Sequence, residues 1–403
     1  MSTRPLGELR IAPPRPEAGR LRLSAELHAP NGARDELWYE IDEYAQGALV
    51  DSADPFVTAF LPLAMRRGHD LRVVGGAVSP SLVENLARFQ EVWHAWHGLP
   101  IVSVVADEEH ERAERPGPAV TSFSGGVDSA FTAWRHTRGT APRGPKLTAA
   151  LMLHGVDIPI ANVVGFTRSA ARSRRMLDSL GLDLVTVRTN VFAVAGGRDY
   201  PIAAGLASGF HLLGARFGTG LVPSTTSYRH LVFPLGSSPV SDALLGSDRL
   251  EVVHDGAGDE RFDKIAQLAT WDEALDSLRV CLSDPQHHRN CGRCVKCMML
   301  LLTFRVLGVT PRCFDTPPSD DEILAWIPSL PSRPFDVQDA WTLVEQAARR
   351  GIDEPWTRAL RRKLLVIRTK EAVRRGAPAW SARVTDVHRR VARALRSRRG
   401  EPS

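Results

Sequence analysis

The stretch from Val120 to Ala133, VTSFSGGVDSAFTA, limits most strongly what this chain can fold into. A short apolar run ends in the hexapeptide SGGVDS, and a helix-compatible segment begins at once. Two adjacent glycines let backbone N–H groups come close to an anion, because no Cβ stands in the way. At the positive end of a helix, such a loop forms an anion-binding nest. The sequence therefore predicts a strand–loop–helix phosphate site.

Side chains of this loop add donors and a charge. Ser124 and Ser129 offer hydroxyl groups, and Asp128 can cap the helix or hold Mg²⁺ against the phosphates. A serine–glycine turn that caps a helix and binds nothing is the simpler interpretation, but the complete string between a strand and a helix favours the phosphate site. The predicted nucleotide-binding residues of the loop are Ser124, Gly125, Gly126, Val127, Asp128 and Ser129.

The loop differs from a Walker-type P-loop, since no Gly-Lys-Ser/Thr follows its glycines. It resembles the PP-loop of the ATP pyrophosphatases, the adenine-nucleotide α-hydrolase-like superfamily. That resemblance implies a parallel-sheet, HUP-like nucleotide domain that binds ATP with Mg²⁺ and splits ATP between its α and β phosphates. Members of the superfamily adenylate a substrate oxygen, and a nitrogen or sulfur nucleophile then displaces AMP.

The length of the chain and its apolar segments bound the architecture. With 403 residues it exceeds one ordinary core, so we expect two or three domains. No apolar stretch approaches the length of a membrane span, and the first 20 residues lack the apolar segment of a secretory signal. We therefore expect a cytoplasmic protein without a membrane partner.

The net charge of +5 is unevenly distributed. From Gly351 onward there are 15 Lys and Arg against 5 Asp and Glu, a net +10, so the rest of the chain carries −5. If this basic C-terminal segment is helical, its arginines and lysines could bind RNA phosphates. We favour the alternative, a charged helical cap packed on an acidic body, because the sequence contains no RNA- or DNA-binding motif.

Composition and periodicity divide the chain into five segments. Residues 1–20, rich in Pro and Arg, are predicted to be a loose arm. Residues 21–106 are predicted to form a small α/β domain, followed by a linker over the charged and then Pro- and Gly-containing residues 107–119. In residues 120–313 strands and helices alternate, which is typical of a parallel α/β sheet. Residues 314–403 are predicted to be helical and basic.

Polar residues at the ends of the predicted strands extend the candidate site. In open parallel sheets, ligands bind at the carboxyl ends of the strands. We therefore expect His154 and Asp157, which follow the second strand of the nucleotide domain, to orient adenine, ribose or substrate. A strand-end histidine that only satisfies hydrogen bonds is the alternative for His154. Arg188, at the end of the third strand, could neutralise phosphate charge.

The cysteines predict a metal site. All five lie between Cys281 and Cys313; Cys291, Cys294 and Cys297 have CxxCxxC spacing, and Cys281 lies ten residues before them. Four thiolates suit a closed tetrahedral Zn²⁺ site. An iron–sulfur cluster is the competing metal, and a reduced helix start without metal is the simplest interpretation.

Together with the loop, this cysteine spacing resembles the 7-cyano-7-deazaguanine synthase family over residues 118–313. The resemblance implies that the four cysteines bind zinc and that Lys264, in RFDKIAQLA, lies near the active site. Asp128 and Lys264 are the predicted catalytic residues. The N-terminal domain, the basic tail and the sequence HGVDIP at 154–159 depart from that family, so we expect a divergent relative with another substrate.

The expected chemistry is that of an adenylating ligase. A carboxylate or similar oxygen of a small acid would attack the α-phosphorus, and ammonia or an amine would then displace AMP. Sulfur transfer, as in tRNA-modifying relatives, is one alternative, but it needs an activated thiolate and only Cys313 would remain for it. A nucleotide-binding module without catalysis is another. An oligomer is compatible with the sequence.

Overall fold

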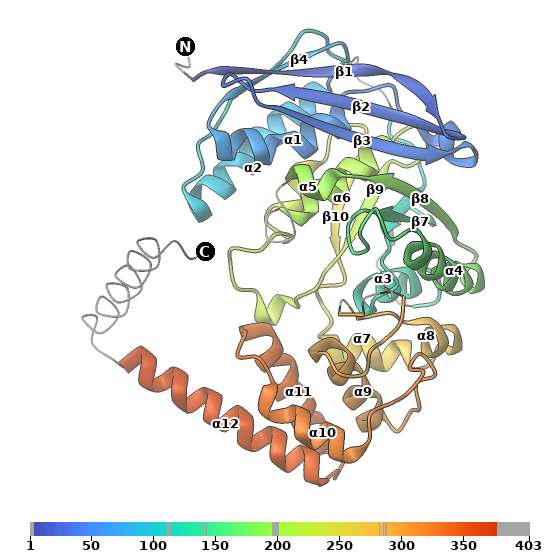
Figure 1. Cartoon of the computed structure of the whole chain (residues 1–403), viewed down its shortest axis with the longest axis vertical. Coiled ribbons are helices and arrows are strands. Elements are labelled where there is room, and N and C mark those ends of the chain that lie inside the picture. The colour runs from blue at the N-terminus through green and yellow to red at the C-terminus, as the bar shows by residue number, and fades with distance from the viewer. Residues whose placement is uncertain are drawn as a thin grey trace, which may run out of the picture. The chain divides into compact units, whose positions relative to one another are not determined.

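The structure is a computed structural model, and it describes residues 4–110, 114–139, 141, 143–195, 201–281, 283–284, 286 and 288–376. It divides into two compact units, Met1–Pro318 and Ser319–Ser403, whose elements are labelled in Figure 1. Among the described helices, none combines the length and the apolar character needed to cross a membrane.

One ten-stranded sheet is the frame of the first unit, in the order β10-β9-β6-β7-β8-β3-β2-β1-β4-β5. Six of its nine described strand pairs are parallel, so the fold is α/β with a mostly parallel sheet, as predicted. The strands are β1 (Leu6–Glu17), β2 (Arg20–His28), β3 (Arg34–Asp42), β4 (Asp70–Val74), β5 (Val104–Ala106), β6 (Ala119–Ser122), β7 (Leu147–His154), β8 (Asp183–Thr189), β9 (Thr219–Pro223) and β10 (Glu251–Asp255).

Helices connect these strands and cover the sheet (Figure 1). The α-helices of the first unit are α1 (Asp54–Arg67), α2 (Pro80–His97), α3 (Val127–Thr137), α4 (Val163–Ser179), α5 (Val191–Ala195), α6 (Ile202–Leu212), α7 (Arg261–Leu268), α8 (Asp272–Ser277) and α9 (Val295–Leu307). Three short 3₁₀ helices add to them: η1 (Glu43–Ala48), η2 (Tyr228–His230) and η3 (Asp242–Leu245).

The five strands β6 to β10 are parallel to one another. All four residues of β6 are buried, as expected of a central strand covered on both faces. The chain proceeds from β6 through β7 to β8, and then returns to place β9 on the other side of β6. This reversal puts a topological switch point between β6 and β9, the place where open α/β sheets bind ligands.

The prediction of a loose arm over residues 1–20 is wrong. Residues Leu6–Glu17 form β1, which pairs antiparallel with β2 and parallel with β4. The prolines argued against a strand in the sequence, because proline has no N–H to donate to the hydrogen bonds between strands. The sheet accommodates them with a register shift between Ala12 and Arg15, while Leu9 is fully buried.

The strands before and after residues 107–119, the predicted linker, belong to the same sheet. Tyr39–Ile41 of β3 pair antiparallel with Val187–Thr189 of β8. Helix α1 also packs on α6, so one continuous core of buried apolar side chains extends from Leu9 to Val252. The predicted N-terminal domain and the nucleotide domain are thus joined edge to edge within the first unit.

The described part of the second unit, up to Gly376, is helical. Helix α10 (Asp320–Trp326) starts with a capping box between Ser319 and Glu322, and η4 (Ile327–Ser329), α11 (Pro334–Arg349) and α12 (Pro355–Gly376) follow. The apolar stripe of α12, which includes Leu360 and Leu364, is buried, and α12 packs on α10 and α11. The predicted second basic helix, over residues 383–400, lies outside the described residues.

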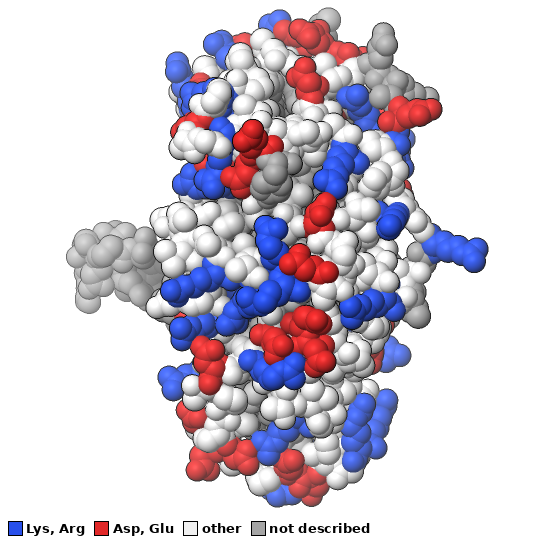
Figure 2. Space-filling view, turned by 90° about the vertical axis from the view of Figure 1, so that its right-hand side faces the viewer, with Lys and Arg blue, Asp and Glu red and all other residues white. Residues whose placement is uncertain are grey.

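Charged side chains of both signs are interspersed over the face shown in Figure 2, and basic ones gather near its middle. Helix α4 lies at the right of Figure 1, on the side that Figure 2 turns toward the viewer. The basic character of the chain is therefore not confined to the C-terminal segment that the charge count singled out.

Candidate functional site

The SGGVDS loop joins β6 to α3 at the switch point of the sheet. Gly125 has a φ of +76°, a left-handed conformation that favours glycine, and a Cβ there would lie 3.3 Å from Ser173 Oγ. The loop is fixed by its own serines: the Ser124 N–H donates to Ser129 Oγ at 3.2 Å, and Ser129 Oγ donates to the Gly126 carbonyl at 3.2 Å. The predicted strand–loop–helix arrangement is confirmed.

Asp128 lies in a cluster of charges at the start of α3. Its Oδ2 accepts from Arg261 Nη2 at 3.0 Å, and its Oδ1 lies 3.4 Å from Lys264 Nζ. Burial opposes ionisation of Asp128, but Arg261 and Lys264 outweigh it and hold the pKa of the carboxyl below its usual range. Asp128 is therefore a carboxylate at neutral pH, and the predicted pair of Asp128 and Lys264 is brought together.

Lys264 is almost completely buried, with 1% of its surface exposed. Its Nζ donates to the Ser224 carbonyl at 2.6 Å and lies 5.6 Å from the centroid of the Phe131 ring. Burial lowers the pKa of Lys264, and Asp128 opposes this shift. A lysine held this way sits between the two strand ends of the switch point, since Ser224 follows β9 and Asp128 follows β6.

A cavity of about 360 Å³ opens at these strand ends. One part of its wall is polar and includes five loop residues: Ser124, Gly126, Val127, Asp128 and Ser129. Three cationic side chains line it too, namely Arg261, Arg279 and Lys296. The other part is apolar and includes Leu151, Met152, Phe166, Phe192 and Leu206. The lining of the cavity thus combines polar and cationic groups with apolar side chains, as is usual for small-molecule sites.

The predicted strand-end residues separate into two groups. Asp157 lines the cavity. His154 is buried and directed to its own loop instead: its Nε2 bonds to the Pro159 carbonyl at 3.0 Å, and its ring stacks on Phe166. Burial lowers the pKa of His154, which keeps the imidazole neutral. These contacts support the alternative interpretation, in which His154 is a strand-end histidine that only satisfies hydrogen bonds.

The Arg188 side chain contacts the neighbouring strand β3. Its Nη1 lies 2.6 Å from Glu40 Oε2, and its guanidinium lies over the Trp38 ring. This pairing follows from the register of β3 on β8, where Glu40 is opposite Arg188. The suggested role of Arg188 in neutralising phosphate is therefore not supported by its contacts.

Arg261, Arg279 and Lys296 were not among the residues predicted from the sequence for this cavity. Arg261 comes three residues before Lys264 on α7, so the helical period alone could have paired them on one face. Lys296 lies inside the CxxCxxC segment, whose cysteines predicted a metal site and gave no sign of a second role. Arg279 carries no sequence signal beyond its position two residues before Cys281.

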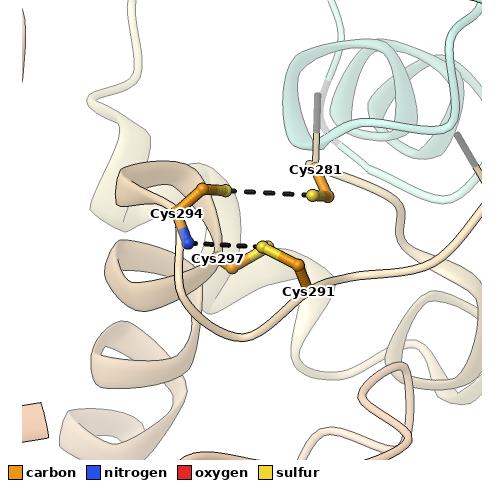
Figure 3. A group of neighbouring side chains, drawn as sticks. All are labelled: Cys281, Cys291, Cys294 and Cys297. Carbon is orange, nitrogen blue, oxygen red and sulfur yellow. Dashed lines mark hydrogen bonds between the residues drawn. The ribbon is translucent and has the colours of Figure 1, made fainter. Parts of the chain in front are cut away.

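The four predicted metal-binding cysteines converge. The Sγ atoms of Cys281, Cys291, Cys294 and Cys297 all lie within 4.8 Å of one another (Figure 3). Two of the separations are 3.9 Å. Tetrahedral zinc, with Zn–S bonds of about 2.3 Å, requires sulfur–sulfur distances of about 3.8 Å. The cluster can therefore hold a metal ion, and its geometry is consistent with zinc.

The backbone around the cluster is shaped for thiolates. The N–H groups of Arg293 and Cys294 donate to Cys291 Sγ at 3.4 and 3.3 Å, the kind of outer hydrogen bond that orients metal ligands. Gly292 has a φ of +69° and makes the turn that brings Cys291 back toward α9. The Asn290 amide also anchors the loop, because it accepts from the Val280 N–H and donates to the Leu278 carbonyl.

Arg279 connects the cysteine cluster with the SGGVDS loop. Its backbone N–H donates to the Gly125 carbonyl at 2.8 Å, and its Nη2 donates to the Ser124 carbonyl at 3.2 Å. Its Nη1 donates to the Cys281 carbonyl at 3.2 Å. One buried arginine therefore holds the loop and the first cysteine in a fixed relation.

The fifth cysteine is outside the cluster. Cys313 is buried, with 2% of its surface exposed, and burial raises the pKa of its thiol to about 12. A thiol of this kind is protonated at neutral pH and does not act as a nucleophile.

No protein-family model matches this chain, and neither does any curated protein or solved structure.

Proposed function

We propose that the chain binds ATP in the cavity at the β6–β9 switch point and cleaves it between the α and β phosphates, as a divergent PP-loop enzyme. The observation that carries this proposal is the SGGVDS loop, which lines a cavity together with Arg261, Arg279 and Lys296. Three cations and a helix N-terminus suit the charge of a triphosphate. The apolar end of the cavity suits adenine.

In the proposed reaction, an oxygen of a small acid attacks the α-phosphorus, and the bond from that phosphorus to the bridging oxygen breaks to release pyrophosphate. Ammonia or an amine then attacks the activated acyl carbon and AMP leaves. Arg261 and Lys296, which line the cavity, would stabilise the charge that develops on the leaving pyrophosphate. Lys264 would hold the Asp128 carboxylate in place at the loop. Asp128 and Asp157, which line the cavity, would hold an ATP-bound Mg²⁺, because carboxylates are the hard oxygen ligands that this cation takes.

The zinc we propose for the four cysteines would be structural. All four positions of a tetrahedral ion are supplied by the protein, so no position is open for substrate. Its contribution would be to hold Arg279 and Lys296 at the nucleotide cavity. The sulfur-transfer alternative lacks support, since the remaining thiol of Cys313 is buried and protonated.

Binding of Mg·ATP, measured by isothermal titration calorimetry, tests the first step. We expect one saturable site per chain, and loss of that site in Gly126→Val. A Cβ at Gly126 would already lie 3.3 Å from Ser124 Oγ, so the two methyl groups of valine would crowd the phosphate end of the cavity. Gly144→Val is the matched control, because a Cβ there meets nothing within 4 Å. Equal affinity in wild type and Gly126→Val would contradict the assignment.

A further inference from the structure

A second cavity, of about 370 Å³, lies against α4. Its charged and titratable lining residues are Arg168, Arg172, Arg175, His288, Arg289 and Asp315. Among the described residues, it shares none of its lining with the nucleotide cavity. Four guanidinium groups thus face one carboxylate in a site to which the proposed ATP chemistry gives no role.

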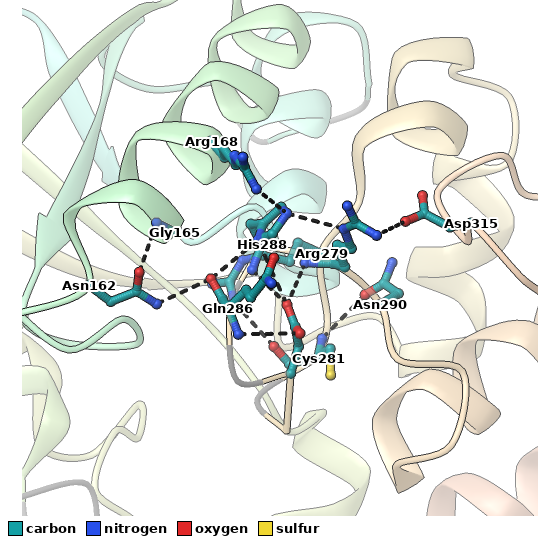
Figure 4. Close-up of polar contacts among 11 residues, drawn as sticks. Asn162, Gly165, Arg168, Arg279, Cys281, Gln286, His288, Asn290 and Asp315 are labelled. Atoms are coloured by element: carbon teal, nitrogen blue, oxygen red, sulfur yellow. Dashed lines mark hydrogen bonds and ion pairs between the residues drawn. The ribbon is translucent and has the colours of Figure 1, made fainter.

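The arginines of α4 are spaced to share one face. Positions 168, 172 and 175 follow the i, i+4, i+7 period of a helix. Asn162 fixes this helix to the chain between Cys281 and Cys291 (Figure 4). Its Oδ1 accepts from the Gly165 N–H at 2.9 Å, and its Nδ2 donates to the Gln286 carbonyl at 3.2 Å. A Cβ at Gly165 would lie 2.2 Å from that carbonyl, so only glycine allows this close approach.

His288 positions two of the guanidinium groups. It is buried, and its Nε2 accepts from Arg168 Nη1 and from Arg289 Nε, both at 3.2 Å. Because arginine can only donate, Nε2 carries the lone pair and the ring proton is on Nδ1, toward the Gln286 carbonyl at 3.3 Å. One acceptor nitrogen therefore orients both arginines without adding a negative charge, and Figure 4 shows Arg168 reaching the ring from α4.

The positive charge of this cavity is only partly compensated. Arg289 pairs with Asp315 at 3.0 Å. The Nη1 atom of Arg172 is buried and has no hydrogen-bond partner within the part of the chain that the structure describes. A buried donor without an acceptor is costly, and a bound anion would remove that cost. The planar guanidinium group of arginine can donate two parallel hydrogen bonds to the oxygens of one phosphate group.

We propose that this cavity binds a small phosphate-bearing anion, of the pyrophosphate or phosphate-ester class, as a second ligand site. A small anion fits better than a nucleic acid because acidic side chains border the basic group on this face (Figure 2). Asp272 and Asp276 of α8, which packs on α4, are among the acidic residues nearby in the fold. A nucleic acid backbone needs an extended basic track.

Titration of inorganic pyrophosphate into the full-length chain, by calorimetry, tests this site. The titration is repeated with Gly126→Val, whose side chain crowds the loop that lines the other cavity, so that the binding that remains reports on the second one. We expect Arg175→Gln and Arg168→Gln each to weaken pyrophosphate binding about tenfold, the usual effect of losing one charge-assisted hydrogen bond. Arg174→Gln is the matched control: it is the neighbouring exposed arginine of α4, it loses the same charge, and we expect less than a twofold change.

Three results would overturn the proposal. The first is no measurable pyrophosphate binding to the wild-type chain. The second is equal weakening in Arg174→Gln and Arg175→Gln, which would indicate a general charge effect. The third is stronger binding of a single-stranded RNA than of pyrophosphate with the same dependence on Arg168 and Arg175, which would assign the cavity to nucleic acid. None of these depends on ATP turnover, so failure of the proposed function would leave this site to stand or fall separately.

Discussion

Replacement of Cys291 by serine is expected to remove the metal from the chain and to lower its unfolding midpoint by roughly 10 °C. Loss of a structural metal costs on the order of 5 kcal/mol, and about 2 °C per kcal/mol is usual for a unit of this size. Because Arg279 bonds to the Cys281 carbonyl and Lys296 lies between two of the cysteines, Mg·ATP affinity should fall as well. Metal content by mass spectrometry, thermal unfolding and calorimetry measure the three effects.

Cys313→Ser is the matched control for Cys291→Ser. It makes the same chemical change at a cysteine outside the cluster, so it should keep one metal per chain and lose only the small stability of one buried side chain. Treatment of the wild-type chain with a chelator should reproduce Cys291→Ser. Full metal content in Cys291→Ser, or equal metal loss in both variants, would show that the cluster is not the metal site.

Lys264→Met is expected to reduce ATP cleavage by about 10²–10³-fold, because Lys264 Nζ holds the Asp128 carboxylate in its position at the loop. The folding stability should change little, by less than about 2 kcal/mol, because methionine fills the space of the buried stem and removes the cost of a buried ammonium. Asp128 would keep Arg261 as its partner. Turnover and thermal unfolding, measured on the same preparation, separate a catalytic loss from a structural one.

Lys146→Met is the control for Lys264→Met, since Lys146 is an exposed lysine at the start of β7. We expect wild-type turnover in Lys146→Met. Retained turnover in Lys264→Met would refute the role proposed for Lys264, as would a loss of turnover that tracks the loss of folded protein.

The parts of the site that depend on local sequence could be predicted. The SGGVDS loop could be assigned to a strand–helix junction because its glycines and flanking periodicity act over a few residues. The cysteine cluster could be predicted because three of its four members lie within seven residues. Lys264 was placed near Asp128 through resemblance alone, and the structure brings the two within 3.4 Å.

The parts that depend on distant segments could not be predicted. Nothing local indicates that β3 pairs with β8, so the partner of Arg188 was hidden until Glu40 was placed opposite it. Arg279 follows the end of α8 by two residues, and the fold brings it to the SGGVDS loop. It donates to the carbonyls of Ser124 and Gly125, which are more than 150 residues away in the sequence, and to the carbonyl of Cys281. The strand β1 was missed for a different reason, since its prolines resemble those of an irregular arm.

The pairing of β3 with β8 changes how the N-terminal region, residues 21–106, should be interpreted. Sequence analysis expected a separate domain over residues 21–106. In the structure, β3 extends the parallel sheet at its β8 edge, and the Tyr39 side chain is buried in the shared core. An edge that would otherwise expose unpaired backbone groups is thereby covered. We expect the N-terminal strands to be required for folding of the parallel part of the sheet, β6 to β10.

The products of ATP cleavage test the proposed function most directly. The purified chain would be incubated with Mg·ATP, a panel of small carboxylic acids and ammonium, and the nucleotides separated by chromatography beside an Asp128→Ala control. We predict AMP and pyrophosphate from the wild-type chain and neither from Asp128→Ala. Formation of ADP and phosphate by the wild-type chain, or equal AMP formation by both proteins, would contradict the proposal.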